Sequence, residues 1–174
     1  MPMNDLHLRV FPDPVLRDKT RPVTLFDDSL KDFVADLVRI MHTEDGVGLA
    51  APQVGVPLKL AVVFFEGVLH VLVNPCVTST EGEQSGEEGC LSFPGIYGTV
   101  VRPEKITLTC HDINGDEVTR EASGFLARAF LHEMDHLDGK LLIDHFSPLK
   151  RSMIRKKLLR TGSEPAEKRR GKRR

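Results

Sequence analysis

The pentapeptide His132-Glu133-Met134-Asp135-His136 constrains the fold of this chain more than any other feature of its sequence. Two histidines four residues apart share one face of a helix, with Cβ atoms about 5–6 Å apart, so their rings can hold one metal ion. The intervening glutamate can reach a water at an open position of that ion and act as a general base. The alternative is a helix whose two histidines are merely packed and hydrogen-bonded.

The residues around the pentapeptide predict a helix that buries it. Ser123 can cap the start of this helix, and apolar residues follow at helical spacing from Phe125 to Leu137. Asp138-Gly139 ends the helix, with glycine in its usual position after the last turn. The histidines are therefore expected on a helix that packs into the core.

A catalytic metal site needs a third protein ligand and an open fourth position. In the related pattern H-E-x-x-H-x-x-G-x-x-H, Gly139 is in place, but Leu142 stands where the third histidine belongs and His145 comes three residues later. The only glutamates beyond the motif, Glu164 and Glu167, lie in a basic segment. We therefore expect the third ligand upstream of the helix.

Cys90 is the candidate for that ligand. It lies in the segment Glu88-Gly89-Cys90-Leu91-Ser92, and a thiolate suits iron, zinc or cobalt. The alternative is a small buried hydrophobic residue, which we expect for Cys76 and Cys110 because each lies within or beside a strand-like run. Three widely spaced cysteines also argue against a disulfide framework and favour a reducing compartment.

The segment Gly46-Val47-Gly48-Leu49-Ala50-Ala51-Pro52-Gln53 is a third candidate element of the site. Its glycines and alanines allow a ligand or another strand to approach the backbone closely. Gln53 offers an uncharged amide donor, which is useful beside a developing oxyanion. The alternative is a glycine-rich turn without a role in chemistry.

The charge is unevenly distributed along the 174 residues, whose formal net charge is −1. Residues 150–174 carry twelve lysines and arginines against two glutamates, a net charge of +10, whereas residues 1–149 carry a net charge of −11. We expect a catalytic domain over 1–149, followed by a basic C-terminal helix and disordered tail over 150–174. A basic arm often meets nucleic acid, and the alternative is a solvated tail.

Hydrophobic periodicity and turn signals indicate an α+β fold. We expect antiparallel or mixed β-sheets packed around the central H-E-x-x-H helix, with an N-terminal and a C-terminal helix. The first helix should begin at Asp27 or Asp28 and end near Asp45-Gly46, and the last should run from 148 to 160. Strands are expected over the ranges 58–65, 68–73, 105–113 and 117–121. Asn74-Pro75 should break the second strand, and Asn114-Gly115 should form a two-residue hairpin turn.

The N-terminal sequence has neither a basic nor an apolar region typical of a secretory signal. The longest apolar run, 60–65, is far too short for a membrane helix. We expect a cytoplasmic protein without a membrane partner, and a monomer by default.

The three motifs together, in this order, resemble the peptide deformylase family. The family patterns G-x-G-x-A-A-x-Q, E-G-C-x-S and H-E-x-x-H are each complete, over 46–53, 88–92 and 132–136. The resemblance covers about residues 5 to 147, and Leu131 departs from the glutamine that many members carry before the first histidine.

This resemblance implies removal of the formyl group from N-formylmethionyl nascent peptides. It also implies one Fe²⁺ ion per chain, which Ni²⁺, Co²⁺ or Zn²⁺ can replace. By position in the motifs, the ligands would be Cys90, His132 and His136, the acid and base would be Glu133, and the oxyanion hole would be Gln53 and the backbone N–H of Leu91.

The peptide is expected to lie extended between the segment 46–49, which includes Gly48, and a strand at Gly89. By resemblance, its methionine side chain would lie in an apolar pocket formed by Val47, Phe125 and Ala129. Arg128 is a less expected neighbour of such a pocket.

Two other functions compete with this interpretation. A metallopeptidase with the same H-E-x-x-H motif would cleave internal peptide bonds and would not need Cys90. An inactive domain tethered to RNA by its basic arm would bind RNA in a salt-sensitive manner. An active enzyme whose C-terminal segment docks on the ribosome combines both features. The apolar face of that segment would consist of Leu149, Met153, Ile154 and Leu158.

Overall fold

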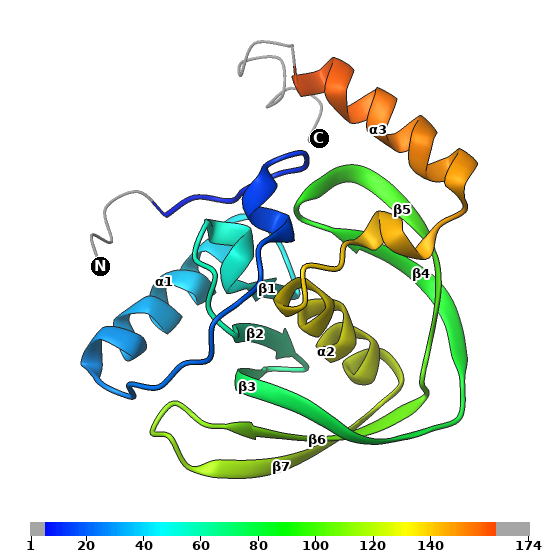
Figure 1. The fold of residues 1–174 in the computed structure, drawn as a ribbon. Coiled ribbons are helices and arrows are strands. Elements are labelled where there is room, and N and C mark those ends of the chain that lie inside the picture. The colour runs from blue at the N-terminus through cyan, green and yellow to red at the C-terminus, as the bar shows by residue number, and fades with distance from the viewer. Residues whose placement is uncertain (1–5, 163–174) are drawn as a thin grey trace.

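Residues 6–162, which the computed structural model describes, form two antiparallel β-sheets and three α-helices (Figure 1). The helices are α1 (Asp28–Thr43), α2 (Gly124–Leu137) and α3 (Pro148–Gly162). The larger sheet has the order β1-β2-β3-β6-β7 and contains β1 (Gly48–Ala50), β2 (Leu60–Phe65), β3 (Val68–Glu81), β6 (Lys105–His111) and β7 (Glu117–Ser123). The smaller sheet pairs β4 (Gln84–Cys90) with β5 (Phe93–Arg102). The expected α+β fold is confirmed.

The helix α2 lies between the larger sheet and the β4–β5 hairpin, as Figure 1 shows. Its Ala127 and Phe130 are buried against the face of the larger sheet formed by β3, β6 and β7. Ser123 occupies the N-cap position as expected, but its side chain makes no capping hydrogen bond. The central position of α2 places both motif histidines inside the molecule.

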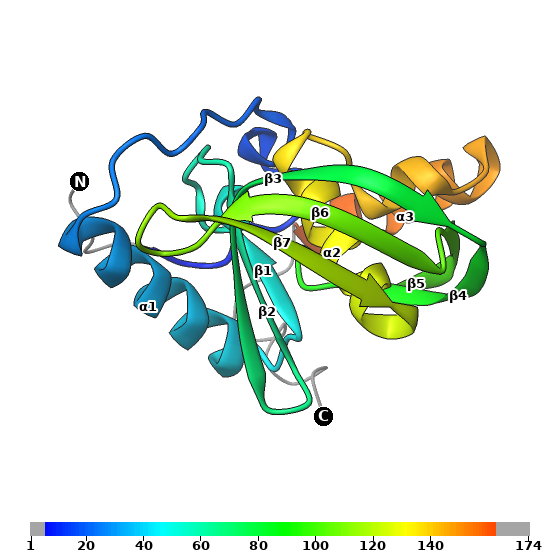
Figure 2. The ribbon, with the colours of Figure 1, turned by 90° about the horizontal axis from the view of Figure 1, so that it is seen from below.

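The helix α1 covers the outer side of the β1–β2 strands (Figure 2). It begins as predicted, because the Asp27 side chain accepts a hydrogen bond of 3.1 Å from the backbone N–H of Leu30. Its apolar stripe, including Phe33, Leu37 and Met41, is buried against Leu49 and neighbouring core residues. This packing fixes the segment that leads from α1 into the glycine-rich motif.

The expected end of β3 at Asn74-Pro75 is wrong. The strand continues to Glu81, with a register shift between Val73 and Cys76 and a φ of 51° at Asn74. The Asn74 amide holds this bend by exchanging hydrogen bonds of 2.8 and 2.9 Å with the backbone of Val23. A proline is tolerated at such an irregularity because no ladder hydrogen bond is needed there. Beyond the bend, β3 runs alongside β6 (Figure 2).

Two further details differ from the sequence-based expectations. The β6–β7 connection is longer than a two-residue turn, since His111 pairs with Glu117 and the Asp112 carboxylate caps the loop by accepting from the N–H groups of Asn114 and Asp116. Cys76 is exposed on β3, whereas Cys110 is buried as expected. The exposure of Cys76 follows from the register shift, which changes the side of the sheet that each later residue faces.

The helix α3 packs over the smaller sheet through part of its expected apolar face. Ile154 and Leu158 are buried, but Leu149 and Met153 are exposed. No helix within residues 6–162 is long and apolar enough to cross a membrane.

An ion pair between Arg17 and Asp144 ties the N-terminal segment to the chain that follows α2. Arg17 donates to both carboxylate oxygens of Asp144 and to the carbonyl of Gly139 at 3.1 Å. Burial acts to raise the pKa of Asp144, but the hydrogen bonds from Arg17 and from the Leu141 N–H outweigh it and lower the pKa. A carboxylate with a lowered pKa stabilises the fold above its unfolded pKa of about 3.9, and this contribution is lost as the pH falls through the folded value.

We predict that Asp144→Asn lowers the free energy of unfolding by about 1 kcal/mol at pH 7, because the bidentate pair is partly buried. The difference from wild type should shrink as the pH falls from about 4 through the lowered folded pKa, since Asp144 is protonated first in the unfolded state and then in the folded state. Urea denaturation at pH 7 and pH 3 measures this. Asp36→Asn, which removes an exposed pair with Arg39, is the control and should cost less than about 0.5 kcal/mol. An Asp144→Asn deficit of equal size at both pH values would contradict the assignment.

Candidate metal centre and catalytic groups

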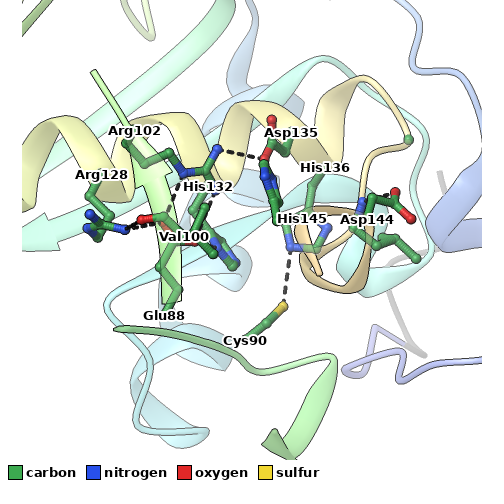
Figure 3. A network of polar contacts seen from close by, with 12 residues as sticks. Glu88, Cys90, Val100, Arg102, Arg128, His132, Asp135, His136, Asp144 and His145 are labelled. Atoms are coloured by element: carbon green, nitrogen blue, oxygen red, sulfur yellow. Dashed lines mark hydrogen bonds and ion pairs between the residues drawn. The ribbon is translucent and has the colours of Figure 1, made fainter. Parts of the chain in front are cut away.

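Cys90, His132 and His136 meet at one point between β4 and α2. Their ligand atoms all lie within 4.8 Å of one another, and the Cys90 Sγ is 3.3 Å from the His136 Nε2 (Figure 3). Two ligands of one tetrahedral ion at about 2.0–2.3 Å are themselves about 3.3–3.8 Å apart. The three side chains therefore have the spacing and the chemistry of a metal site with one open position.

The protonation of the two histidines also fits a metal site. Burial holds the pKa of His136 well below its ordinary value, so its ring is neutral at pH 7. Burial acts in the same direction on His132, but the neighbouring Cys90 and Glu88 outweigh it and raise the pKa of His132. The space beside the thiol thus favours a positive charge, which a divalent cation would supply.

Glu88 orients His132 from the strand β4. Its Oε2 lies 3.0 Å from the His132 Nδ1, which leaves Nε2 of that ring directed at the metal position. Arg102 donates to both carboxylate oxygens, at 2.8 and 2.9 Å, and Arg128 donates to Oε1 at 2.8 Å. Burial acts to raise the pKa of Glu88, but the hydrogen bonds with Arg102 and His132 and the charges of these two residues outweigh it and hold the pKa well below its usual range. Glu88 is therefore ionised although it is buried.

The network continues from Arg102 across α2. Arg102 donates to the Asp135 Oδ2 at 2.8 Å, and the same oxygen is 2.8 Å from the His145 Nε2 (Figure 3). His145 thus contacts the helix that carries the two motif histidines, and it does not belong to the group of three side chains that could hold a metal ion. The sequence carries no local signal for the role of Arg102, which is 30 residues from the first motif histidine.

Glu133 is buried beside the ligands, and its Oε2 has no hydrogen-bond partner. Burial raises the pKa of Glu133 to about 7. A Cβ atom at Gly48 would lie 2.5 Å from the Glu133 Oε1, so only glycine at this position of β1 leaves room for the carboxylate. A buried carboxylate with a free oxygen and a pKa near neutrality is suited to accept and donate a proton.

Gln53 lies beside the Cys90 thiol. Its Oε1 accepts a hydrogen bond of 2.9 Å from the Ala50 N–H, which fixes the amide orientation. Its Nε2 therefore faces the site, where it donates to the Ser92 Oγ at 3.1 Å and lies 3.7 Å from the Cys90 Sγ. The glycine-rich motif is thus a short edge strand followed by a 3-10 turn, Ala51–Val54, and it is more than a simple turn.

A cleft of about 810 Å³ opens onto these groups. Of the site residues expected from the sequence, it is lined by Val47, Gly48, Gln53, Gly89, Cys90, Leu91, Phe125, Ala129, His132 and Glu133, whereas His136 lies behind them. Leu91 lies in the tight turn between β4 and β5, and its side chain fills the space where a Cβ of Gly46 would be. The strands β4 and β5 were not predicted, apart from an extended segment at Gly89. The sequence of β4 is rich in glutamate and glycine, and that of β5 is interrupted by Pro94, Gly95 and Gly98.

A helix with two histidines and a buried glutamate, facing a cysteine thiol from a strand, is the site of a metal-dependent hydrolase. The model of the polypeptide deformylase family matches residues 6–152, and the chain belongs to this family, whose members remove the N-formyl group from nascent polypeptides. A peptide deformylase of Thermotoga sp. strain RQ2 is 44% identical over 153 residues, which cover 87% of this chain and 93% of that protein.

Two further relatives agree with this assignment. A peptide deformylase of Brucella suis is 42% identical over 167 residues, 92% of this chain and 95% of that protein. The crystal structure of a peptide deformylase from Legionella pneumophila matches with a TM-score of 0.86 at 43% identity, covering 92% of this chain and 99% of that one. The sequence, the fold and the site therefore lead to the same family.

We predict that Glu88→Gln weakens metal binding about 10- to 100-fold, because a neutral amide holds the His132 ring less firmly. Competition with a chromophoric chelator measures the affinity. Glu87→Gln is the matched control, since Glu87 is exposed on the same strand, and it should bind metal as wild type does. Equal affinities of the two variants would show that Glu88 has no such role.

Proposed function

We propose that Cys90, His132 and His136 hold one Fe²⁺ ion, and that Glu133 moves the proton when the formyl group of an N-formylmethionyl peptide is hydrolysed. The observation that carries this proposal is the convergence of three ligand atoms within 4.8 Å beside a buried carboxylate with an unpartnered oxygen. When bound, such an ion acts as a Lewis acid and lowers the pKa of water. The thiolate suits iron, and also zinc, cobalt or nickel as substitutes.

Glu133 supplies the proton transfers of the reaction. Its free oxygen accepts a proton from the water whose oxygen attacks the formyl carbon. The Gln53 amide and the Leu91 N–H donate hydrogen bonds to the oxygen that becomes negative, and the fixed orientation of the Gln53 amide supports this role. Glu133 then gives its proton to the amine nitrogen as the carbon–nitrogen bond breaks. Formate and a peptide with a free amino terminus leave.

The peptide lies extended between Gly48 and Gly89, with its methionine side chain among Val47, Phe125 and Ala129. Two features support this placement. All five residues line the cleft, and β1 is the edge strand of its sheet, so its backbone can pair with an added strand. Backbone pairing of this kind accepts many sequences beyond the first residue, which suits an enzyme that acts on many nascent chains.

The catalytic domain spans 1–149, and the segment 150–174 is a basic arm that docks on the ribosome. The buried side chains Ile154 and Leu158 anchor α3 to the domain, while Arg155, Lys156 and Lys157 between them are exposed. Residues 163–174 lie outside the described part of the chain. We also propose that the protein is a cytoplasmic monomer, consistent with its substrates and with the absence of a membrane-spanning helix from residues 6–162.

We predict that the metal-loaded wild type releases formate from formyl-Met-Ala-Ser, and that Glu133→Ala is at least about 1000-fold slower because it lacks the proton carrier. Formate is measured under anaerobic conditions with Fe²⁺ or Ni²⁺, and the metal content of both proteins is measured in parallel. A metal-loaded wild type that releases no formate would overturn the proposed function. A fast Glu133→Ala variant would overturn only the role of Glu133.

We predict that deletion of residues 161–174 weakens cosedimentation with ribosomes, because it removes six of the twelve basic residues of the arm. Cleavage of the free tripeptide should stay within about twofold of wild type, since the deletion leaves the cleft intact. The ribosome affinity of the full chain should fall with increasing salt. Unchanged cosedimentation after the deletion would contradict the proposed docking of the basic arm on the ribosome.

A further inference from the structure

The serine that ends the E-G-C-x-S motif has no part in the chemistry proposed above, although it adjoins the site. Ser92 is fully buried, and it follows Leu91 in the turn between β4 and β5. It does not line the cleft, so it does not touch a peptide bound there. Any effect of Ser92 on the reaction therefore acts through a neighbour that does line the cleft.

That neighbour is Gln53, which lines the cleft and is only 1% exposed. The Gln53 Nε2 donates a hydrogen bond of 3.1 Å to the Ser92 Oγ. This nitrogen carries two N–H groups, so one of them remains for an acceptor in the cleft. At the other end of the amide, the Ala50 N–H donates to Oε1 at 2.9 Å. The amide group is thus held at both ends.

The backbone of the N-terminal segment fixes the direction of the Ser92 hydroxyl. The Ser92 Oγ donates a hydrogen bond of 2.8 Å to the Arg9 carbonyl. A hydroxyl has one hydrogen, so with this donor used Oγ can only accept from the Gln53 amide. The flipped amide, with Oε1 towards Ser92, would place two oxygens together without a hydrogen between them. The Arg9 carbonyl therefore selects the amide orientation that leaves an N–H for the cleft.

Two backbone hydrogen bonds hold the same N-terminal segment in place. The Arg9 N–H donates to the Gln53 carbonyl at 2.7 Å, and the Phe11 N–H donates to the Ser92 carbonyl at 2.9 Å. Leu6 and Leu8 pack against the core and anchor the start of the segment. The segment thus joins the 3-10 turn that carries Gln53 to the β4–β5 turn that carries Ser92.

We propose that Ser92 is a positioning residue, which orients the Gln53 amide towards the oxygen that becomes negative, and that the backbone of residues 9–11 anchors it. Hydrogen-bond donors stabilise a developing charge best when they are oriented before the reaction begins. An amide held only at Oε1 would need to be ordered again at each turnover. This inference rests on the proposed function, since it assigns Gln53 to that oxygen.

The first test observes the Gln53 amide without turnover. The chain contains two glutamines, Gln53 and Gln84, so Zn²⁺-loaded protein labelled with glutamine carrying ¹⁵N in its side chain gives two NH₂ signal pairs. The spectrum of Gln53→Leu identifies the pair of Gln53. In Ser92→Ala this pair should shift, and its hydrogens should exchange with water at least about tenfold faster.

Gln84 is the internal control, because its Nε2 donates to the Pro103 and Gly124 carbonyls at 3.0 and 2.8 Å and does not contact Ser92. Its signals should be the same in wild type and Ser92→Ala. A Gln53 pair that neither shifts nor exchanges faster in Ser92→Ala overturns the proposal. Equal changes in both pairs also overturn it, since they would indicate a general loosening of the domain.

The second test measures turnover of formyl-Met-Ala-Ser. In Ser92→Ala, kcat should fall about three- to tenfold, the worth of one neutral hydrogen bond, while KM and metal affinity stay within about twofold. Thr20→Val is the matched control, because it also removes a hydroxyl that donates to a backbone carbonyl, that of Leu137 at 2.7 Å. Its kcat should stay within about twofold of wild type. A loss as large as that of Ser92→Ala would overturn the proposal.

A double-mutant cycle shows whether Ser92 acts through Gln53. Gln53→Leu alone should lower kcat about 100-fold, and adding Ser92→Ala should lower it less than about twofold further. A further loss as large as in the wild-type background would overturn the proposal. A metal-loaded wild type that releases no formate would overturn the proposed function instead, and the Gln53 signals would still show whether Ser92 orients the amide.

Discussion

The buried carboxylate of Glu88 is the contact on which the rest of the site depends. It joins three elements, because it accepts from Arg102 on β5 and from Arg128 on α2, and it holds the ring of His132. A buried charge is costly unless it is paired and hydrogen-bonded, and two guanidinium groups and an imidazole satisfy both oxygens here. The same contacts fix α2 against the smaller sheet. The contacts that orient the His132 ring therefore also hold the two parts of the domain together.

Two glycines leave space for charged side chains of the site. The carboxylate of Glu133 can lie beside the ligands because Gly48 presents no side chain to it, and the Arg128 guanidinium fits over Gly86 for the same reason. The two glycines belong to β1 and β4, the strands between which the peptide is proposed to lie. Because these two glycines lack side chains, the backbone of β1 and β4 can approach α2 closely and still leave space for Glu133 and Arg128.

Local sequence patterns predicted the elements whose structure is set locally. The Asp27 cap, the apolar stripe of α1 and the spacing of His132 and His136 need only the period of a helix, and all three are present in the structure. The continuation of β3 through Asn74-Pro75 depends on Val23, which lies far away in sequence. The role of Arg102 on β5 depends on pairing between β4 and β5, and the glutamate- and glycine-rich sequence of β4 gives no strand signal. Contacts of this kind do not appear in a single sequence, so the arginine network could not be predicted from it.

The central claim is that one thiolate and two imidazoles hold the metal. X-ray absorption spectroscopy at the metal edge of the Zn²⁺-loaded protein tests it most directly. We expect one sulfur at about 2.3 Å and two imidazole nitrogens at about 2.0–2.1 Å from the ion. A shell of nitrogen and oxygen without sulfur would exclude Cys90 as a ligand and contradict the account.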